Sequence, residues 1–308
     1  ELINRLEHSR VNRSFVAMPD LYLDHLANFD DQPAELLAKF KSILERGGGN
    51  MPYVPQEFCL GGNAANFSLI LSGLGAQVSL IARSSEFGYS VLRFFTRDSN
   101  LDLTHVKVEG RLSTSFILEV KGGASPANIM ISDPGEVRDF GFDRLTEGNL
   151  RVIEKSDYVC IFNWSQNRKG TNLAIKVFEF ARQVDGKKTF LDLGDPSWRI
   201  DEIPELMTRL SAQNLLNILG VNENEVRQIC KAMKLYSVGE PINLAKLLSE
   251  KTGFEVALHT STFAALCKSG DAVVVPAFDL IPLRVTGAGD AWNAGFLFGD
   301  AIGLDEKG

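Results

Sequence analysis

The second half of the chain alternates between short apolar segments and segments whose apolar residues recur at helical spacing. The predicted strands span residues 158–162, 188–193, 215–221, 254–258, 263–267 and 272–275. The predicted helices span 171–184, 224–233 and 242–252, and another helix follows Asp290. Parallel strands need crossover helices, which cover the faces of the sheet. This alternation therefore predicts an α/β protein whose largely parallel sheet is covered on both faces.

The first half of the chain has a different pattern. It contains predicted strands at 14–18 and 78–82 and predicted helices at 34–46, 62–73 and 86–98. Two β-rich segments, 114–121 and 128–132, then follow each other without a helix between them, which predicts a hairpin. We therefore expect a small β-lid beside the α/β core.

Composition and charge exclude several functional classes. The chain has 39 acidic and 32 basic side chains, a formal net charge of −7, which argues against a nucleic-acid partner or an anionic membrane surface. No apolar run approaches the roughly 18 residues of a membrane helix. The four cysteines are widely spaced and predict neither a zinc site nor a disulfide framework, so we expect a cytoplasmic protein.

Residues 287–290 read Gly-Ala-Gly-Asp and precede an apolar helical segment. The first N–H groups of a helix have no intrahelical partner, and the helix dipole favours an anion beside them. The small residues Gly287, Ala288 and Gly289 would let a phosphate approach the backbone. Asp290 would then be placed as a base for a hydroxyl that attacks the phosphate. A simple glycine turn with an N-terminal aspartate cap fits the same residues.

A second small-residue segment, residues 60–66, reads Leu-Gly-Gly-Asn-Ala-Ala-Asn. Its glycines, Gly62 among them, permit close approach of a ligand. Asn63 and Asn66 could hydrogen-bond the hydroxyl groups of a polar ligand. A strand-to-helix turn with Asn63 as N-cap is the alternative. The segment does not match the Gly-x-Gly-x-x-Gly fingerprint, so it gives little support to a dinucleotide site.

Polar groups also follow the predicted strand at 215–221, where Asn222 and Glu225 begin the next helix. Parallel sheets hold ligands at the carboxyl ends of their strands. An amide and a carboxylate at that edge suit water-mediated binding of Mg²⁺. An N-cap followed by an acidic residue in the first turn explains the pair equally well.

Four further carboxylates follow predicted strands. Asp20 and Asp24 come after the strand at 14–18 and could accept hydrogen bonds from substrate hydroxyls. Asp192 and Asp195 come at the end of the strand at 188–193, where a ligand contact and a loop cap are both consistent with the sequence.

Taken in chain order, these segments resemble the ribokinase family, the pfkB-type carbohydrate and nucleoside kinases. The resemblance rests on the glycine-asparagine motif at 61–66, the Asn-x-x-Glu motif at 222–225 and the Gly-Ala-Gly-Asp motif at 287–290. The β-rich pair at 114–132 falls where the family has its lid strands. Nearly the whole chain, from about residue 14 to residue 304, is covered.

The resemblance implies a single ribokinase-like kinase domain over residues 1–308, with lid segments at about 19–60 and 110–133. Its fold would be a three-layer α/β sandwich with a mostly parallel central sheet and a small β-lid. The implied reaction transfers the γ-phosphate of ATP, with Mg²⁺, to a hydroxyl of a small polar substrate, with a sugar favoured. It also implies that a homodimer can form through the lid and that further helices follow residue 308.

The family's site residues carry over by position. Asp290 would take the hydroxyl proton, and the backbone of Gly287, Ala288 and Gly289 would stabilise charge on the transferred phosphate. The substrate-binding residues implied by the resemblance are Asp20, Asp24, Gly62, Asn63 and Asn66. Those implied for the nucleotide are Asn222, Glu225, His259, Ser261 and Ala264, with Glu225 also at the metal.

The sequence departs from common family patterns in four places. Arg284 and Val285 stand where Asp-Thr is usual, and residues 259–264 lack the glycines of the usual Thr-x-Gly-x-x-Gly nucleotide loop. Asn63 stands where relatives that act on phosphorylated sugars often have lysine, which favours an unphosphorylated substrate. The segment 27–51 is longer than the family leads us to expect.

Two alternatives to a sugar kinase remain open. A nucleoside kinase is one, because Tyr22 and Phe116 could stack on a base. A catalytically silent sugar- or nucleotide-binding regulator is the other, because the nucleotide loop and residue 284 are altered. The retained Asp290 favours an enzyme, since a binding module would not need it.

Overall fold

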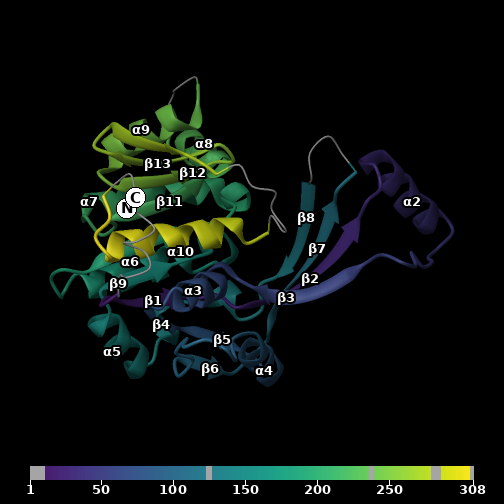
Figure 1. Cartoon of the computed structure of the whole chain (residues 1–308), viewed down its shortest axis with the longest axis horizontal. Coiled ribbons are helices and arrows are strands. Elements are labelled where there is room, and N and C mark those ends of the chain that lie inside the picture. The colour runs from purple at the N-terminus through teal and green to yellow at the C-terminus, as the bar shows by residue number, and fades with distance from the viewer. Residues whose placement is uncertain (1–10, 123–126, 236–238, 279–285, 306–308) are drawn as a thin grey trace.

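The computed structural model describes residues 11–122, 127–235, 239–278 and 286–305. Within these ranges the centre of the molecule is an eight-stranded sheet in the order β14-β13-β12-β11-β10-β9-β1-β4 (Figure 1). Its strands are β1 (Ser14–Met18), β4 (Gln77–Leu80), β9 (Tyr158–Ile161), β10 (Lys188–Asp192), β11 (Ile218–Asn222), β12 (Glu255–His259), β13 (Phe263–Lys268) and β14 (Asp271–Pro276). The pairings from β4 to β12 are parallel, and β13 and β14 join antiparallel.

Helices cover both faces of this sheet, so successive residues of a central strand are buried in different layers. In β1, Val16 and Met18 pack in one apolar cluster with α5 to α9, whereas Phe15 and Ala17 pack in the other with α3 and α10. The helices are α3 (Asn63–Gly73), α4 (Glu86–Phe95), α5 (Glu147–Lys155), α6 (Gly170–Ala181), α7 (Ile203–Ala212), α8 (Glu223–Ala232), α9 (Pro241–Thr252) and α10 (Ala288–Ala301). None of the helices in the described ranges is long and apolar enough to cross a bilayer.

A second sheet of four strands projects from one side of this core (Figure 1). Its order is β3-β2-β7-β8, and its strands are β2 (Tyr22–Phe29), β3 (Gln56–Gly61), β7 (Ser113–Val120) and β8 (Ala127–Asp133). The helix α2 (Pro33–Glu45) packs on its outer end through Leu36 and Phe40. A separate two-stranded sheet pairs β5 (Ala82–Ser84) with β6 (Val106–Val108).

The structure confirms the predicted α/β fold with a mainly parallel central sheet. The predicted single strand at 78–82 is wrong, because the chain bends at Ile81 and pairs β4 with β1 but β5 with β6. The strands β2 and β3 were not predicted. Their sequences do not alternate clearly between apolar and polar residues, and their strand geometry comes from pairing within the second sheet.

Candidate functional site

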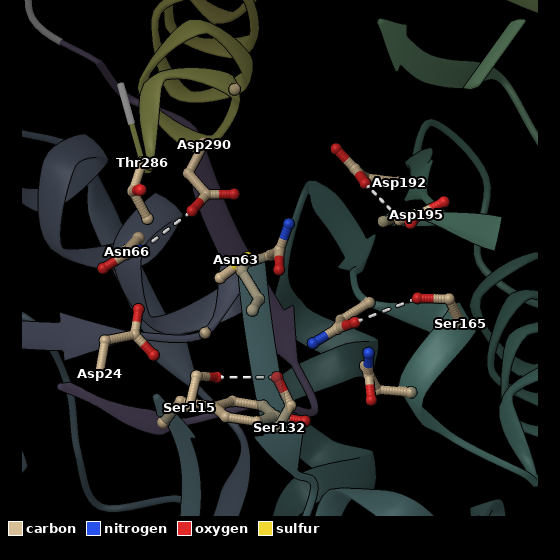
Figure 2. Close-up of a pocket in the computed structure, with 18 of the residues that line it drawn as sticks. Asp24, Asn63, Asn66, Ser115, Ser132, Ser165, Asp192, Asp195, Thr286 and Asp290 are labelled. Atoms are coloured by element: carbon tan, nitrogen blue, oxygen red, sulfur yellow. Dashed lines mark hydrogen bonds between the residues drawn. The ribbon is translucent and has the colours of Figure 1, made fainter. Parts of the chain in front are cut away.

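A pocket of about 520 Å³ lies between the carboxyl ends of the central strands, the N-terminus of α10 and the inner face of the second sheet (Figure 2). Parallel α/β sheets carry ligand sites at this edge because the loops there come from several strands at once. The described residues that line it are Tyr22, Asp24, Gly62, Asn63, Asn66, Ser115, Asn128, Met130, Ser132, Asn163, Ser165, Gln166, Asp192, Gly194, Asp195, Trp198, Asn222, Glu225, His259, Thr286, Gly287, Gly289 and Asp290.

Asp290 lies in the first turn of α10 and is buried, yet it lines the pocket. Asn66 Nδ2 of α3 donates a 3.0 Å hydrogen bond to Asp290 Oδ2 (Figure 2). Burial raises the pKa of Asp290 well above its usual 3.8, and the nearby carboxylates of Asp192 and Asp20 raise it further, while the bond from Asn66 opposes this. A carboxylate whose pKa lies closer to neutrality is a better proton acceptor for a hydroxyl.

The turn before α10 presents backbone to the pocket. Gly287 has φ of +88°, a left-handed conformation that side-chain-bearing residues rarely adopt, and it is the N-cap of the helix. Thr286 Oγ1 donates to Glu119 Oε1 on β7 at 3.2 Å, which ties this turn to the second sheet. The free N–H groups of the first turn and the helix dipole make this end of the pocket attractive to an anion.

The glycine-asparagine motif lies beside the α10 turn, where Asn66 contacts Asp290. Gly61, the last residue of β3, lies directly against the Asp24 side chain. A Cβ built on Gly61 would lie only 2.2 Å from the Asp24 carboxylate, so the position has no room for a side chain. Asp20 has a different role. Its carboxylate accepts hydrogen bonds from the backbone N–H groups of Asn63 and Ala64 at 2.7 and 2.9 Å. It accepts another from Asn163 Nδ2 at 3.0 Å. Asp20 therefore caps α3 and is absent from the pocket wall.

Asn222 and Glu225 form a capping box at the start of α8. The Asn222 N–H donates to Glu225 Oε2 at 2.9 Å, and Asn222 Nδ2 donates to Glu225 Oε1 at 2.8 Å. Burial raises the pKa of Glu225 well above its usual 4.5, and Asp192 adds to the effect. Asp192 in turn accepts a 2.6 Å bond from Asn293 Nδ2 of α10.

Among the described residues, no three His, Cys, Asp or Glu side chains form a metal-binding cluster.

His259 ends β12 beside the α10 turn. Its ring stacks on Trp292 with centroids 4.9 Å apart, and a Cβ built on Gly289 would lie 3.4 Å from His259 Nε2. Burial lowers the pKa of His259 to about 4, so the ring is neutral at pH 7. The ring faces this turn as a hydrogen-bonding group without charge.

The structure brings most of the residues singled out in the sequence to this one pocket. The pocket-lining members of that set are Asp24, Gly62, Asn63, Asn66, Asp192, Asp195, Asn222, Glu225, His259, Gly287, Gly289 and Asp290. Four others lie outside the wall: Asp20 caps α3, Ala288 is the first residue of α10, Ser261 is exposed on the turn between β12 and β13, and Ala264 pairs with β14. Arg284 and Val285 lie outside the described residues.

Several lining residues were not singled out as site residues from the sequence. Ser115 and Ser132 contact each other at 3.0 Å on the second sheet, and Asn163 follows β9. The position of Asn163 after an apolar strand was a usable signal, since Asn222 was selected on that ground. The serines had no such signal, because only the pairing of β7 with β8 turns them toward the pocket.

The pocket is strongly acidic. Asp24, Asp192, Asp195, Glu225 and Asp290 line it, whereas no lysine or arginine among the described residues does. Carboxylates and amides at such a density suit the hydroxyl groups of a neutral polar ligand, and no described cation lines the wall near Asp24 to balance a phosphate group bound there.

Comparison with known proteins agrees with this geometry. The model of the pfkB family of carbohydrate kinases matches residues 54–305. The chain belongs to the pfkB carbohydrate kinase family. This pfkB kinase is 23% identical over 248 residues to a Pyrococcus horikoshii protein that is named, provisionally, as a sugar kinase; the match covers 78% of this chain and 72% of that protein.

Solved structures share the fold of this pfkB kinase. Adenosine kinase from Sinorhizobium meliloti superposes with a TM-score of 0.75 at 16% identity, covering 96% of this chain and 91% of that one. Arabidopsis thaliana ribokinase, solved with ribose and ATP, gives a TM-score of 0.70 at 16% identity, covering 96% and 88% of the two chains. At this identity the likeness establishes the ribokinase-like fold.

Proposed function

We propose that this pfkB kinase transfers the γ-phosphate of ATP to a hydroxyl group of a neutral, unphosphorylated sugar. The observation that carries the proposal is the pairing of a buried, pocket-lining Asp290 with an open helix N-terminus in the same turn. A proton acceptor and an anion-binding backbone at one point are the two groups that phosphoryl transfer to an alcohol requires.

In this proposal Asp290 accepts the proton of the attacking hydroxyl, and Asn66 holds the carboxylate in place through its 3.0 Å bond. The N–H groups at Gly287, Ala288 and Gly289 stabilise the negative charge that develops on the transferred phosphate. Asp24, Gly62 and Asn63 bind and orient the acceptor. Orientation and electrostatics then supply most of the rate, since the transferred group needs little covalent help.

The residues also fit Mg²⁺. Mg²⁺ keeps several waters and takes few direct protein ligands, so an oxygen-donor pair beside the phosphate site suits it without a protein cage. Asn222 and the buried Glu225 provide such a pair at the end of β11. When bound, Mg²⁺ would neutralise phosphate charge, and Glu225 would hold its waters. His259 would contact the nucleotide as a neutral hydrogen-bonding ring.

The acidic pocket favours a free sugar over a phosphorylated one, as described above, and Asn63 leaves no cation at the early motif. A nucleoside is the second candidate, since Tyr22 lines the pocket. Phe116, which could have served the same purpose, lies on the other face of the second sheet, where it packs beside His25 with ring centroids 5.1 Å apart. That placement weakens the case for a nucleoside substrate.

We further propose that the second sheet is the lid of a single kinase domain. Its inner face contributes Ser115, Met130 and Ser132 to the pocket, so movement of the sheet would open or close the acceptor site. A closed lid would exclude water, which otherwise competes with the sugar as acceptor.

The outer face of this lid is apolar, and we propose that it contacts a second copy of the chain. His25, Phe58, Phe116 and Ile131 form one row across all four strands, and Phe58 and Ile131 are 60% and 59% exposed. Sedimentation of the wild type is expected to give a dimer, and Phe116→Glu a monomer. A monomeric wild type would refute this contact.

The test of the function is to incubate the protein with ATP, Mg²⁺ and a panel of sugars, sugar phosphates and nucleosides, and to follow ADP release. We expect turnover with a free sugar. Turnover restricted to nucleosides would establish the second candidate. Binding of a sugar without turnover on any compound would show a regulator.

A further inference from the structure

Trp198 is an exposed aromatic residue at the rim of the pocket. It is 89% exposed, yet it lines the pocket beside Asp195 and Gln166. The other two tryptophans are packed: Trp164 is fully buried, and Trp292 stacks between His259 and Phe296. Tryptophan is large and mostly apolar, so an indole left in water at the mouth of a ligand pocket indicates a contact that forms when the ligand binds.

The backbone around Trp198 is firmly anchored. The neighbouring Arg199 donates from Nη1 to the Trp164 carbonyl at 2.6 Å and also to the Asn167 carbonyl, and its guanidinium lies 4.1 Å from the Trp164 ring centroid. Arg199 is paired with Glu202 on its other side. An exposed ring whose backbone is already held in place loses little further conformational freedom when it contacts a ligand.

Among the described residues, the pocket has one strongly exposed ring, that of Trp198. Of its described lining residues, only Tyr22, His259 and Trp198 carry rings, and Tyr22 is buried while His259 faces the α10 turn. Figure 2 shows Asp195, three residues before Trp198, across the pocket from Asp24. Trp198 follows β10 in the core, whereas the pocket residues Asp24, Ser115 and Ser132 belong to the second sheet.

We propose that Trp198 is a specificity-determining residue of the acceptor site and that its indole stacks on the apolar face of a sugar ring. This inference rests on the proposed sugar kinase function. A sugar ring has hydroxyl groups around its edge and C–H groups on its faces. The carboxylates and amides of the pocket bind the edge, and the indole covers a face, which selects sugars that present an uninterrupted C–H face.

Steady-state kinetics with the best acceptor sugar test this assignment. Trp198→Ala is expected to raise the KM for the sugar roughly tenfold, with kcat and the KM for ATP within about twofold of wild type. Trp198→Phe keeps a ring and should recover most of the loss. The matched control is Phe87→Ala, an exposed aromatic residue on α4 that does not line the pocket. A sugar KM unchanged in Trp198→Ala, or an equal rise in the KM for ATP, would overturn the proposal.

A binding measurement without nucleotide separates this proposal from the kinase activity itself. Titration with the sugar should change the tryptophan fluorescence of the wild type, and the change should be lost in Trp198→Phe. If the signal is specific to Trp198 but no compound is phosphorylated, the kinase function fails and the stacking contact stands. If sugars are phosphorylated normally by Trp198→Ala, the stacking contact fails and the function stands. A signal seen with nucleosides alone would also overturn the sugar assignment.

Discussion

Asn66 on α3 donates a hydrogen bond of 3.0 Å to Asp290 on α10, across 224 positions of sequence. The bond joins the glycine-asparagine motif to the Gly-Ala-Gly-Asp motif. Both helices pack on the same face of the central sheet, which brings their N-termini together at the pocket. The bond favours the charged form of Asp290 against the effect of burial, so it bears on both the orientation and the pKa of this carboxylate.

Replacement of Asp290 with asparagine should separate activity from stability. We expect kcat to fall about 10²- to 10⁴-fold, because the proton acceptor is lost. The melting temperature should rise at neutral pH, because the pKa of Asp290 is raised by folding and its charge therefore opposes the folded state. Activity assays and thermal melts check both effects. Asp98→Asn, a change at an exposed surface carboxylate, is the control and should alter neither. Wild-type turnover in Asp290→Asn would refute the catalytic role.

Removal of the Asn66 amide should move the pH profile. The bond from Asn66 lowers the pKa of Asp290, so Asn66→Ala should raise that pKa further. Because the charged carboxylate is the active form, the acid limb of kcat/KM should shift to higher pH, with the greatest loss of activity at low pH. Asn224→Ala, at an exposed position of α8, should leave the limb in place. A limb that moves to lower pH in Asn66→Ala would contradict the assignment.

Alanine at Gly61 should damage the acceptor site selectively. The added Cβ would lie 2.2 Å from the Asp24 carboxylate, which must rotate away. We expect the KM for the acceptor to rise about tenfold or more with the KM for ATP nearly unchanged. Gly73→Ala at the end of α3 is the matched control, because a Cβ there meets no atom within 4 Å. Equal effects of the two substitutions would show that Asp24 does not bind the acceptor.

Glu225→Gln should weaken the use of Mg²⁺. The amide can still accept a hydrogen bond from the Asn222 N–H, so α8 should keep its cap. It loses the charge that would hold the waters of Mg²⁺, and the half-saturating Mg²⁺ concentration in the kinase assay should rise about tenfold. Glu223→Gln neutralises a carboxylate in the same first turn, outside the pocket, and serves as the control. An identical Mg²⁺ dependence in Glu225→Gln and wild type would refute the role.

His259 should remain neutral across the working pH range. Burial lowers its pKa from 6.5 to about 4, so its imidazole resonances should not titrate between pH 8 and pH 5 in an NMR experiment. Below pH 6.5 the unfolded chain binds this proton before the folded one does. The stability of the wild type should therefore fall between pH 6.5 and pH 4, and His259→Asn should lose this part of the pH dependence. A His259 resonance that titrates near pH 6.5 would contradict the buried assignment.

Local sequence pattern predicted the elements whose signal lies within one segment. The helix predicted at 62–73 is observed as Asn63–Gly73, and the strand predicted at 14–18 is observed as Ser14–Met18. The strand β2 was missed, because its eight residues mix polar and apolar side chains on both faces of the second sheet. Tyr22 and Asp24 line the pocket on one face, and Ala27 and Phe29 are buried beside α2 on the other, so no simple alternation marks the strand.

The site residues likewise divide into those that local motifs indicate and those whose role depends on contacts across the fold. Asp290 and Asn66 could be chosen from their motifs, because the chemistry of a phosphate-binding turn is local: small residues, free N–H groups and a carboxylate within one helical turn. The role of Asp20 could not, because its carboxylate takes the N–H groups of residues more than 40 positions away. The exposed position of Trp198 on its fixed base likewise depends on the contacts of Arg199 with the β9 end of the sheet.

The sequence alone determined the fold class and the family, because hydrophobic periodicity and short motifs record both within single segments. The tertiary structure decided which carboxylates line the pocket and which accept hydrogen bonds from the backbone, and it brought the second sheet and an exposed tryptophan to the same pocket. The physical reason is that burial, hydrogen-bond partners and pKa arise from atoms brought together across the fold, and no local pattern records them.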